Sequence, residues 1–181
     1  MPNWCSNSVT FYNEDVSKID ALEQELKKGE DAQIFTHFLP IPEGVEDWYS
    51  WNVNNWGTKW DANVYQWDRE DNNTLSVIFD TAWSPPISVY EHLTNENWNI
   101  SAFYYEPGMA FIGKYENGDD QYYEYDITNL ESIKQLPEDI IEYGNLIDEY
   151  EYFYEQSLED EDEEPQNFTE EEESEDLKDI E

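Results

Sequence analysis

The chain has 181 residues, of which 45 are acidic and 8 are basic, so its formal net charge at pH 7 is −37. This length suits one domain of ordinary size with an appendage. The charge argues against direct binding to nucleic acid or to an anionic membrane, because both depend on lysine and arginine side chains that neutralise phosphates.

The first predicted elements along the chain are a strand and a helix. Val9 and Phe11 alternate with polar residues over 7–13, which predicts a half-buried strand. A helix is predicted directly after it, with lysines in its last turn and Gly29 as its C-cap. The apolar stripe of this helix consists of Val16, Ile19, Leu22 and Leu26.

A second strand and a second helix are predicted from residue 74 onward. Residues 74–83 alternate in hydrophobicity, with Leu75, Val77 and Phe79 on one face. Ser84 then fits a helix N-cap and Pro85 the first helical residue. The stripe of this helix consists of Ile87, Tyr90 and Leu93.

Residues 99–126 predict three further strands. The pair Pro107-Gly108 fits a type II turn between the first two, and Asn117-Gly118 fits a type I′ hairpin between the last two. The order strand, helix, strand, helix, strands predicts an α+β fold. We expect a ferredoxin-like antiparallel sheet with helices on one face.

Four short blocks carry a family resemblance. They are "NWCSNSVTF" at 3–11, "NNWGTKWDA" at 54–62, "FDTAWSPP" at 79–86 and "YYEPGMAFIGKYENG" at 104–118. Over about the first 120 residues, these blocks resemble the YubB-like ferredoxin-domain family of phage and plasmid proteins. The resemblance implies a ferredoxin-like fold and a mobile-element origin, and it implies no catalytic residue. The blocks end before the acidic C-terminal segment.

Five of the eight tryptophans lie between Trp48 and Trp67. Exposed rings would form a platform for stacking bases or sugars, whereas buried rings would fill the core of a very polar chain. We favour the core, because the negative charge would repel the phosphates that accompany bases. Lys59, within this cluster, is expected to be a counter-ion for Asp61 or for another acid.

The sequence shows little sign of catalytic chemistry. His37 and His92 are isolated from other metal-ligating residues, and Cys5, the single cysteine, is expected to be a buried and inert thiol. No phosphate-binding loop or nucleophile motif occurs. We therefore expect no enzyme activity, no cofactor and no metal site. Without a signal peptide or an apolar run of membrane length, a cytoplasmic location is expected.

The C-terminal part is more acidic than the rest. Residues 1–113 hold 18 acids and 5 bases, whereas residues 114–181 hold 27 acids and 3 bases, so the net charges are −13 and −24. Apolar residues at steps of three and four predict one continuous helix, with a kink possible at Gly144 and Asn145. Its stripe consists of Leu136, Ile140, Tyr143, Ile147, Tyr150, Tyr154 and Leu158.

The predicted domains are a ferredoxin-like domain over 1–128, an acidic helical segment over 129–164 and a disordered acidic tail over 165–181. Around the apolar stripe stand Glu142, Asp148, Glu149, Glu151, Glu155 and Glu159, and no lysine or arginine is placed to pair with them. As a helix of ~1.5 Å rise per residue, residues 138–181 would carry about one net charge per 3.3 Å, close to the ~3.4 Å spacing of charge along one nucleic-acid strand.

This match predicts a nucleic-acid mimic that occludes the DNA- or RNA-binding groove of a basic host protein, such as a defence nuclease. The expected phosphate-mimicking residues are Glu138, Asp139, Glu142, Asp148, Glu149, Glu151, Glu155, Glu159, Asp160, Glu161, Asp162, Glu163 and Glu164. The alternative is a non-enzymatic ferredoxin-like binding module, in which the tryptophan-rich surface holds a small ligand or a host protein and the acids only solubilise the chain. A homodimer that pairs two apolar stripes also stays open.

Overall fold

The computed structural model describes residues 3–162, with side chains described as far as Leu158. The six strands form one sheet in the order β2-β3-β1-β4-β5-β6, and every neighbouring pair is antiparallel. The strands are β1 (Trp4–Tyr12), β2 (Asn63–Arg69), β3 (Thr74–Ala82), β4 (Asn99–Glu106), β5 (Phe111–Glu116) and β6 (Asp119–Glu124).

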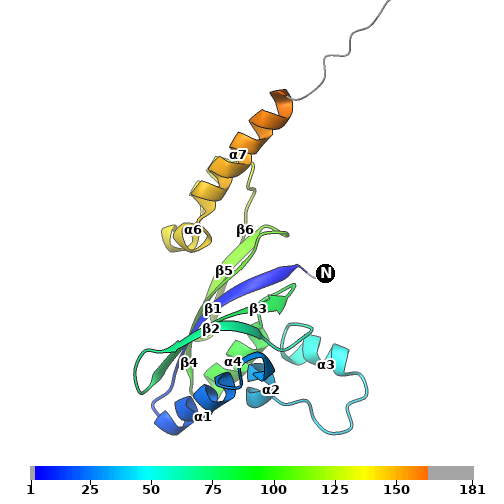
Figure 1. Cartoon of the computed structure of the whole chain (residues 1–181), viewed down its shortest axis with the longest axis vertical. Helices are drawn as coiled ribbons and strands as arrows, with labels where there is room; N and C mark the ends of the chain where they lie inside the picture. The colour runs from blue at the N-terminus through cyan, green and yellow to red at the C-terminus, as the bar shows by residue number, and fades with distance from the viewer. Residues whose placement is uncertain (1–2, 163–181) are drawn as a thin grey trace, which may run out of the picture.

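The helices within the described residues fall into two groups (Figure 1). The first group is α1 (Val16–Leu26), the short 3₁₀ turn η1 (Gly29–Asp31), α2 (Ile34–Phe38), α3 (Trp48–Asn55) and α4 (Ile87–Asn95). The second group is α5 (Leu130–Lys134), α6 (Glu138–Gly144) and α7 (Leu146–Asp162). The path β1-α1-β2-β3-α4-β4 and the strand order confirm the predicted α+β, ferredoxin-like antiparallel sheet, which β5 and β6 extend at one edge.

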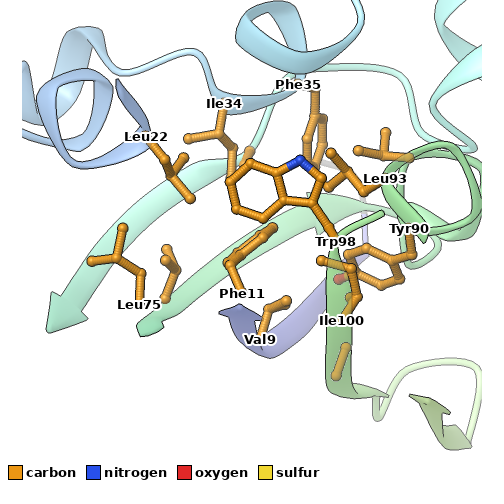
Figure 2. Packing of buried hydrophobic residues seen from close by; sticks show 14 of the residues in the cluster. Val9, Phe11, Leu22, Ile34, Phe35, Leu75, Tyr90, Leu93, Trp98 and Ile100 are labelled. Atoms are coloured by element: carbon orange, nitrogen blue, oxygen red, sulfur yellow. The ribbon is translucent and has the colours of Figure 1, made fainter. Parts of the chain in front are cut away.

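The main core lies between one face of the sheet and helices α1, α2 and α4. Val9 and Phe11 of β1 point into it, as the alternation of the strand predicts. Figure 2 shows Trp98 in the middle of this core, between the sheet residues and the helices. The ring of Trp98 meets Phe11 edge-on, with centroids 6.4 Å apart, and meets Phe38 at 5.3 Å.

A second, smaller core lies on the opposite face. Successive side chains of a strand point to opposite faces, so Ile100 and Ala102 of β4 enter the main core while Phe103 and Tyr105 point away from it. Helices α5, α6 and α7 cover this second face over β4–β6. The fully buried members of the second core are Ile112, Ile133, Ile140 and Leu146, each with an exposure of 0%.

The sequence pattern does not predict strand β2, because this strand is irregular. A register shift between Val64 and Gln66 breaks the alternation that marks a strand. Val64 pairs with Phe79 and Trp67 with Val77, so both apolar residues face the core although they are three positions apart. The bulge therefore hides the pattern.

The turns and caps were predicted in part. Asn117 and Gly118 both have positive φ, 46° and 103°, as a type I′ hairpin requires, so this prediction is confirmed. The type II turn at Pro107-Gly108 is wrong, because the left-handed residue of that loop is Ala110 with φ 52°. The N-cap at Ser84 is also wrong. Its hydroxyl donates to the Gly57 carbonyl at 2.6 Å, and the helix begins two residues after Pro85.

Candidate functional site

The acidic helices α6 and α7 are attached to the sheet by a few close contacts. Ile140 and Leu146 are fully buried. A methyl group added to Gly144 would lie 2.6 Å from Ile112 Cδ1, so the α6 backbone rests directly on β5. Asn145 adopts a left-handed conformation, φ 50° and ψ 36°, and ends α6. The prediction of one continuous helix is therefore wrong, and the break lies at the expected position.

Polar contacts add to this attachment. Asp139 of α6 forms an ion pair with Lys114 of β5 at 2.5 Å, and the nearby ammonium holds the pKa of this carboxyl below its usual range. The hydroxyl of Tyr105 donates to Glu149 of α7. Burial, and then this carboxylate, raise the pKa of Tyr105. Tyr143 stacks on Phe103 with ring centroids 4.9 Å apart.

These contacts divide the predicted contact acids into two kinds. Asp139 and Glu149 already bind side chains of the sheet, Lys114 and Tyr105, so they are less available to a partner. The exposed members are Glu138, Glu142, Asp148, Glu151 and Glu155, and none of them forms an ion pair within the described part of the chain. Of the remaining candidates, Glu159, Asp160, Glu161 and Asp162 lie on the α7 backbone with side chains outside the description, and Glu163 and Glu164 lie outside the described residues. The tail predicted for 165–181 lies outside them too.

Helix α7 leaves the sheet after its first turns and projects from the domain (Figure 1). Every residue from Glu151 to Leu158 is exposed. Asp148, Glu151 and Glu155 stand at steps of three and four, so they share one face of the helix, turned away from the buried Leu146. Unpaired carboxylates are thus held in a row by a folded element.

Large aromatic side chains are exposed beside this row. Tyr152 is 67% exposed, Phe153 46% and Tyr154 52%. A hollow of about 460 Å³ opens between the start of α7 and the β4–β5 loop. Its lining comprises Pro107, Tyr125, Ile127, Asn145, Asp148, Glu149, Tyr152 and Phe153. The sequence reading missed the hollow, because its walls come from segments that are far apart in the chain.

The tryptophan cluster divides between core and surface. Trp56 is buried and Trp51 and Trp67 pack against the main core, whereas Trp48 and Trp60 are exposed. The core interpretation therefore holds for three rings of the five.

The predicted pairing of Lys59 with Asp61 is wrong, and Lys59 forms no ion pair with any other acid in the part of the chain that the structure describes. Asp61 instead accepts hydrogen bonds from the backbone N–H groups of Phe35 and Thr36, both at 2.8 Å, at the start of α2. The Lys59 ammonium lies over aromatic rings, 4.4 Å from the ring centroid of Trp60, 5.6 Å from that of Trp83 and 5.7 Å from that of Tyr49. Three exposed aromatic residues thus border this cation, and a fourth, Trp4, lies 6.2 Å from the ring of Trp60.

The described residues offer little for catalysis. Among them, no group of three or more histidine, cysteine, aspartate or glutamate side chains could hold a metal ion. Cys5 is fully buried, and burial raises the pKa of its thiol to about 12, so it is the inert thiol that was expected. No helix within residues 3–162 is long and apolar enough to cross a membrane.

Comparisons with known proteins concern the fold. Residues 59–143, from before β2 to the end of α6, match the family described as "Ferredoxin-like domain in Api92-like protein". Among solved structures, the crystal structure of protein api92 from Yersinia pseudotuberculosis has 24% sequence identity and a TM-score of 0.35, covering 52% of this chain. The chain spans 36% of that protein's length. The comparison with curated proteins found no match. Residues 59–143 are therefore similar to this family, and together with the sheet topology the match supports a ferredoxin-like domain in this chain.

Proposed function

We propose that the chain is a non-enzymatic nucleic-acid mimic, which uses the acids of α7 to occupy the DNA- or RNA-binding groove of a basic host protein. The observation that carries this proposal is the row Asp148, Glu151 and Glu155 on a helix that projects from the domain and lacks ion pairs within the described residues. A solvated helix would normally alternate charges of opposite sign for mutual support. Because these acids have no ion pairs within the described residues, their full negative charge is available to attract a basic partner.

The spacing of the row supports recognition by phosphate-binding side chains. At ~1.5 Å per residue, Asp148 and Glu151 lie about 4.5 Å apart along the helix axis, and Glu151 and Glu155 about 6 Å. A line of lysine or arginine side chains that normally grips phosphates could engage carboxylates at such intervals. Because the folded helix already holds these acids in place, little conformational entropy is lost when a partner binds them.

The hollow beside the row suits one cationic side chain. Tyr125, Tyr152 and Phe153 offer ring faces, and Asp148 and Glu149 offer carboxylates around the same space. An arginine would gain a cation–π contact and a charge-assisted hydrogen bond there. Such a contact would add specificity that long-range charge alone does not supply.

The setting of this proposal comes from the resemblance to YubB-like phage and plasmid proteins. A mobile element gains from blocking a host defence nuclease, so we propose a phage-encoded inhibitor that acts in the host cytoplasm. Steered association would be fast, and affinity would fall steeply as salt rises.

The test compares two variants with the same change of net charge. One neutralises the row, Asp148→Asn with Glu151→Gln and Glu155→Gln, and the control neutralises three exposed acids elsewhere, Asp31→Asn with Glu43→Gln and Glu46→Gln. Basic proteins captured from a host lysate by the parent chain are identified by mass spectrometry. Displacement of a labelled DNA duplex or RNA strand from each purified target is then titrated.

We expect the row variant to displace nucleic acid at least about tenfold less well, which corresponds to ~1.4 kcal/mol, and the control to act almost like the parent. Equal losses in both variants would show that total charge matters and the row does not. Binding without displacement would contradict the occlusion mechanism.

A further inference from the structure

The four blocks that carry the family resemblance meet at one end of the sheet. Asn3 and Trp4 come from the first block, Lys59 and Trp60 from the second, Trp83 from the third and Met109 from the fourth. The backbone N–H of Trp83 donates to the Asn3 carbonyl at 2.9 Å, and the rings of Trp4 and Trp60 lie 6.2 Å apart. Segments separated by up to about a hundred residues therefore build one surface, which is distinct from the acids of α7.

The loop that presents Lys59 is firmly held. The Asn52 side-chain N–H donates to the Lys59 carbonyl at 2.9 Å, and the Thr58 hydroxyl donates to the Ala82 carbonyl at 3.0 Å. The Ser84 hydroxyl holds the Gly57 carbonyl at 2.6 Å, and Gly57 has φ 81°. Asn52 and Thr58 are both buried. Such anchoring prepares the loop for binding, since little conformational freedom is left to lose.

Trp83 is held in an unfavourable backbone conformation. Its φ is 72°, in the left-handed region that favours glycine, and yet 42% of the residue is exposed. Core packing therefore does not account for a large ring at this position. Strained residues of this kind cluster at functional sites, where the strain is retained because the side chain is used.

Lys59 is the feature that indicates the ligand. In a chain with 45 acidic residues, it forms no ion pair with any carboxylate that the structure describes, whereas Lys27, Lys28 and Lys114 pair with Glu23, Glu25 and Asp139. Its ammonium lies among three rings and is half-buried with its residue. A carboxylate brought by a ligand would find here a cation with weakened hydration and unused hydrogen-bond donors.

Trp83 also lines an apolar hollow of about 380 Å³. It is lined by Asn3, Trp83, Met109, Phe111, Tyr122 and Glu124. Trp83 thus borders both the cation and the hollow, so one extended ligand could place a carboxylate on Lys59 and an apolar side chain in the hollow. Exposed tryptophan and tyrosine next to an apolar pocket are typical of the energetic centre of a protein interface.

We infer that this Lys59 surface binds a short acidic and apolar segment of a partner protein, with one carboxylate on Lys59 and a neighbouring apolar side chain in the hollow beside Trp83. A nucleic acid would also offer anions and flat rings. It is disfavoured because many phosphates would meet the negative charge of the rest of the chain, whereas the segment needs a single carboxylate.

The experiment uses the full chain and two peptides, acetyl-Leu-Glu-Leu-Leu-amide and the same peptide with glutamine in place of glutamate. Binding is followed by the NMR signals of the tryptophan indole N–H groups at about 0.15 M salt. The parent chain should bind the glutamate peptide at least about tenfold more tightly, and Lys59→Met should abolish this difference. The control Lys134→Met, which removes an exposed lysine paired with Glu131, should preserve it.

Trp83→Gly provides an independent readout. Glycine accepts the left-handed conformation, so the melting temperature should stay level or rise while peptide affinity falls by about tenfold or more. Equal affinity for both peptides, no binding of either at millimolar concentration, or unchanged binding by both variants would overturn the inference. Binding of an eight-residue oligothymidylate in place of the glutamate peptide would overturn it as well.

Discussion

The two faces of the sheet are used in different ways. On one face, α1, α2 and α4 enclose a continuous core of aromatic and aliphatic side chains around Trp98 (Figure 2). On the other face, α5–α7 bury a small group around Ile112 and Ile140, after which α7 runs into solvent (Figure 1). The larger core on the first face stabilises the domain. The second face buries fewer apolar side chains and carries the exposed carboxylates of α7. The larger core therefore lies on one face, and the carboxylates that we propose as the binding site lie on the other.

The largest effect is expected from the main core. Phe11 is almost fully buried and contacts both Phe38 and Trp98. Phe11→Ala should lower the free energy of unfolding by about 3–5 kcal/mol, because a buried ring is replaced by a cavity. Urea denaturation measures this loss. Tyr12→Ala, at the neighbouring and partly exposed position, should cost far less, and equal losses would contradict the assignment of faces.

A smaller and more local effect is expected from the second core. Ile140→Ala should cost about 2–4 kcal/mol, since it removes a fully buried side chain beneath α6. Hydrogen exchange should show faster opening of α6 and α7 than of β1 and β3. The proposed binding of a basic protein should weaken as well. The matched control is Ile141→Ala at a half-buried position. Uniform loosening of the whole sheet would show that the two faces are not separate units.

The close approach of α6 to β5 allows a third test. Gly144→Ala introduces a methyl group that meets Ile112 Cδ1 and Leu146 Cδ2, at 2.6 and 2.8 Å, so we expect a loss of about 1–3 kcal/mol from overpacking. Asn145→Gly should be neutral or slightly stabilising, because glycine suits the left-handed conformation there. Thermal denaturation compares the two, and a neutral Gly144→Ala would argue that α6 can move away from the sheet.

The smallest effect concerns the ion pair of Asp139 with Lys114. Asp139→Asn should cost less than about 1 kcal/mol at pH 7, because the pair is partly exposed and water screens it. Lys114 lowers the pKa of this carboxyl in the folded state below its ordinary value of 3.8. The stabilisation is therefore present at neutral pH and is lost as pH falls below about 4 through the folded-state pKa. The difference in stability between parent and variant should shrink over this range.

Regular alternation made much of the fold predictable. The sequence predicts β1, β3, β4 and α1 because their buried residues recur at strand or helix spacing. The order of the elements along the chain then predicts the antiparallel ferredoxin-like sheet. β2 could not be placed, because its bulge changes which residues face the core. The C-terminal stripe predicts helix correctly. Its pattern does not show that Ile140 is buried against the sheet while Tyr154 is exposed.

The candidate sites were less accessible to sequence reading. The acids of α7 were recognised by composition, and their division into packed and exposed members depends on Lys114 and Tyr105, which belong to other strands. For Lys59, chain proximity suggested Asp61 as its partner. Asp61 faces the start of α2 instead, where backbone N–H groups satisfy it.

Composition and local periodicity by themselves determined the acidic character of the chain, the class of its fold and the types of most elements, because these depend on residue content and on neighbours in sequence. The tertiary structure decided which acids are exposed, that α7 projects, and that Lys59 sits among rings from separate segments. Those outcomes depend on contacts between residues far apart in the chain, and hydrophobic burial assembles such contacts without leaving a local pattern.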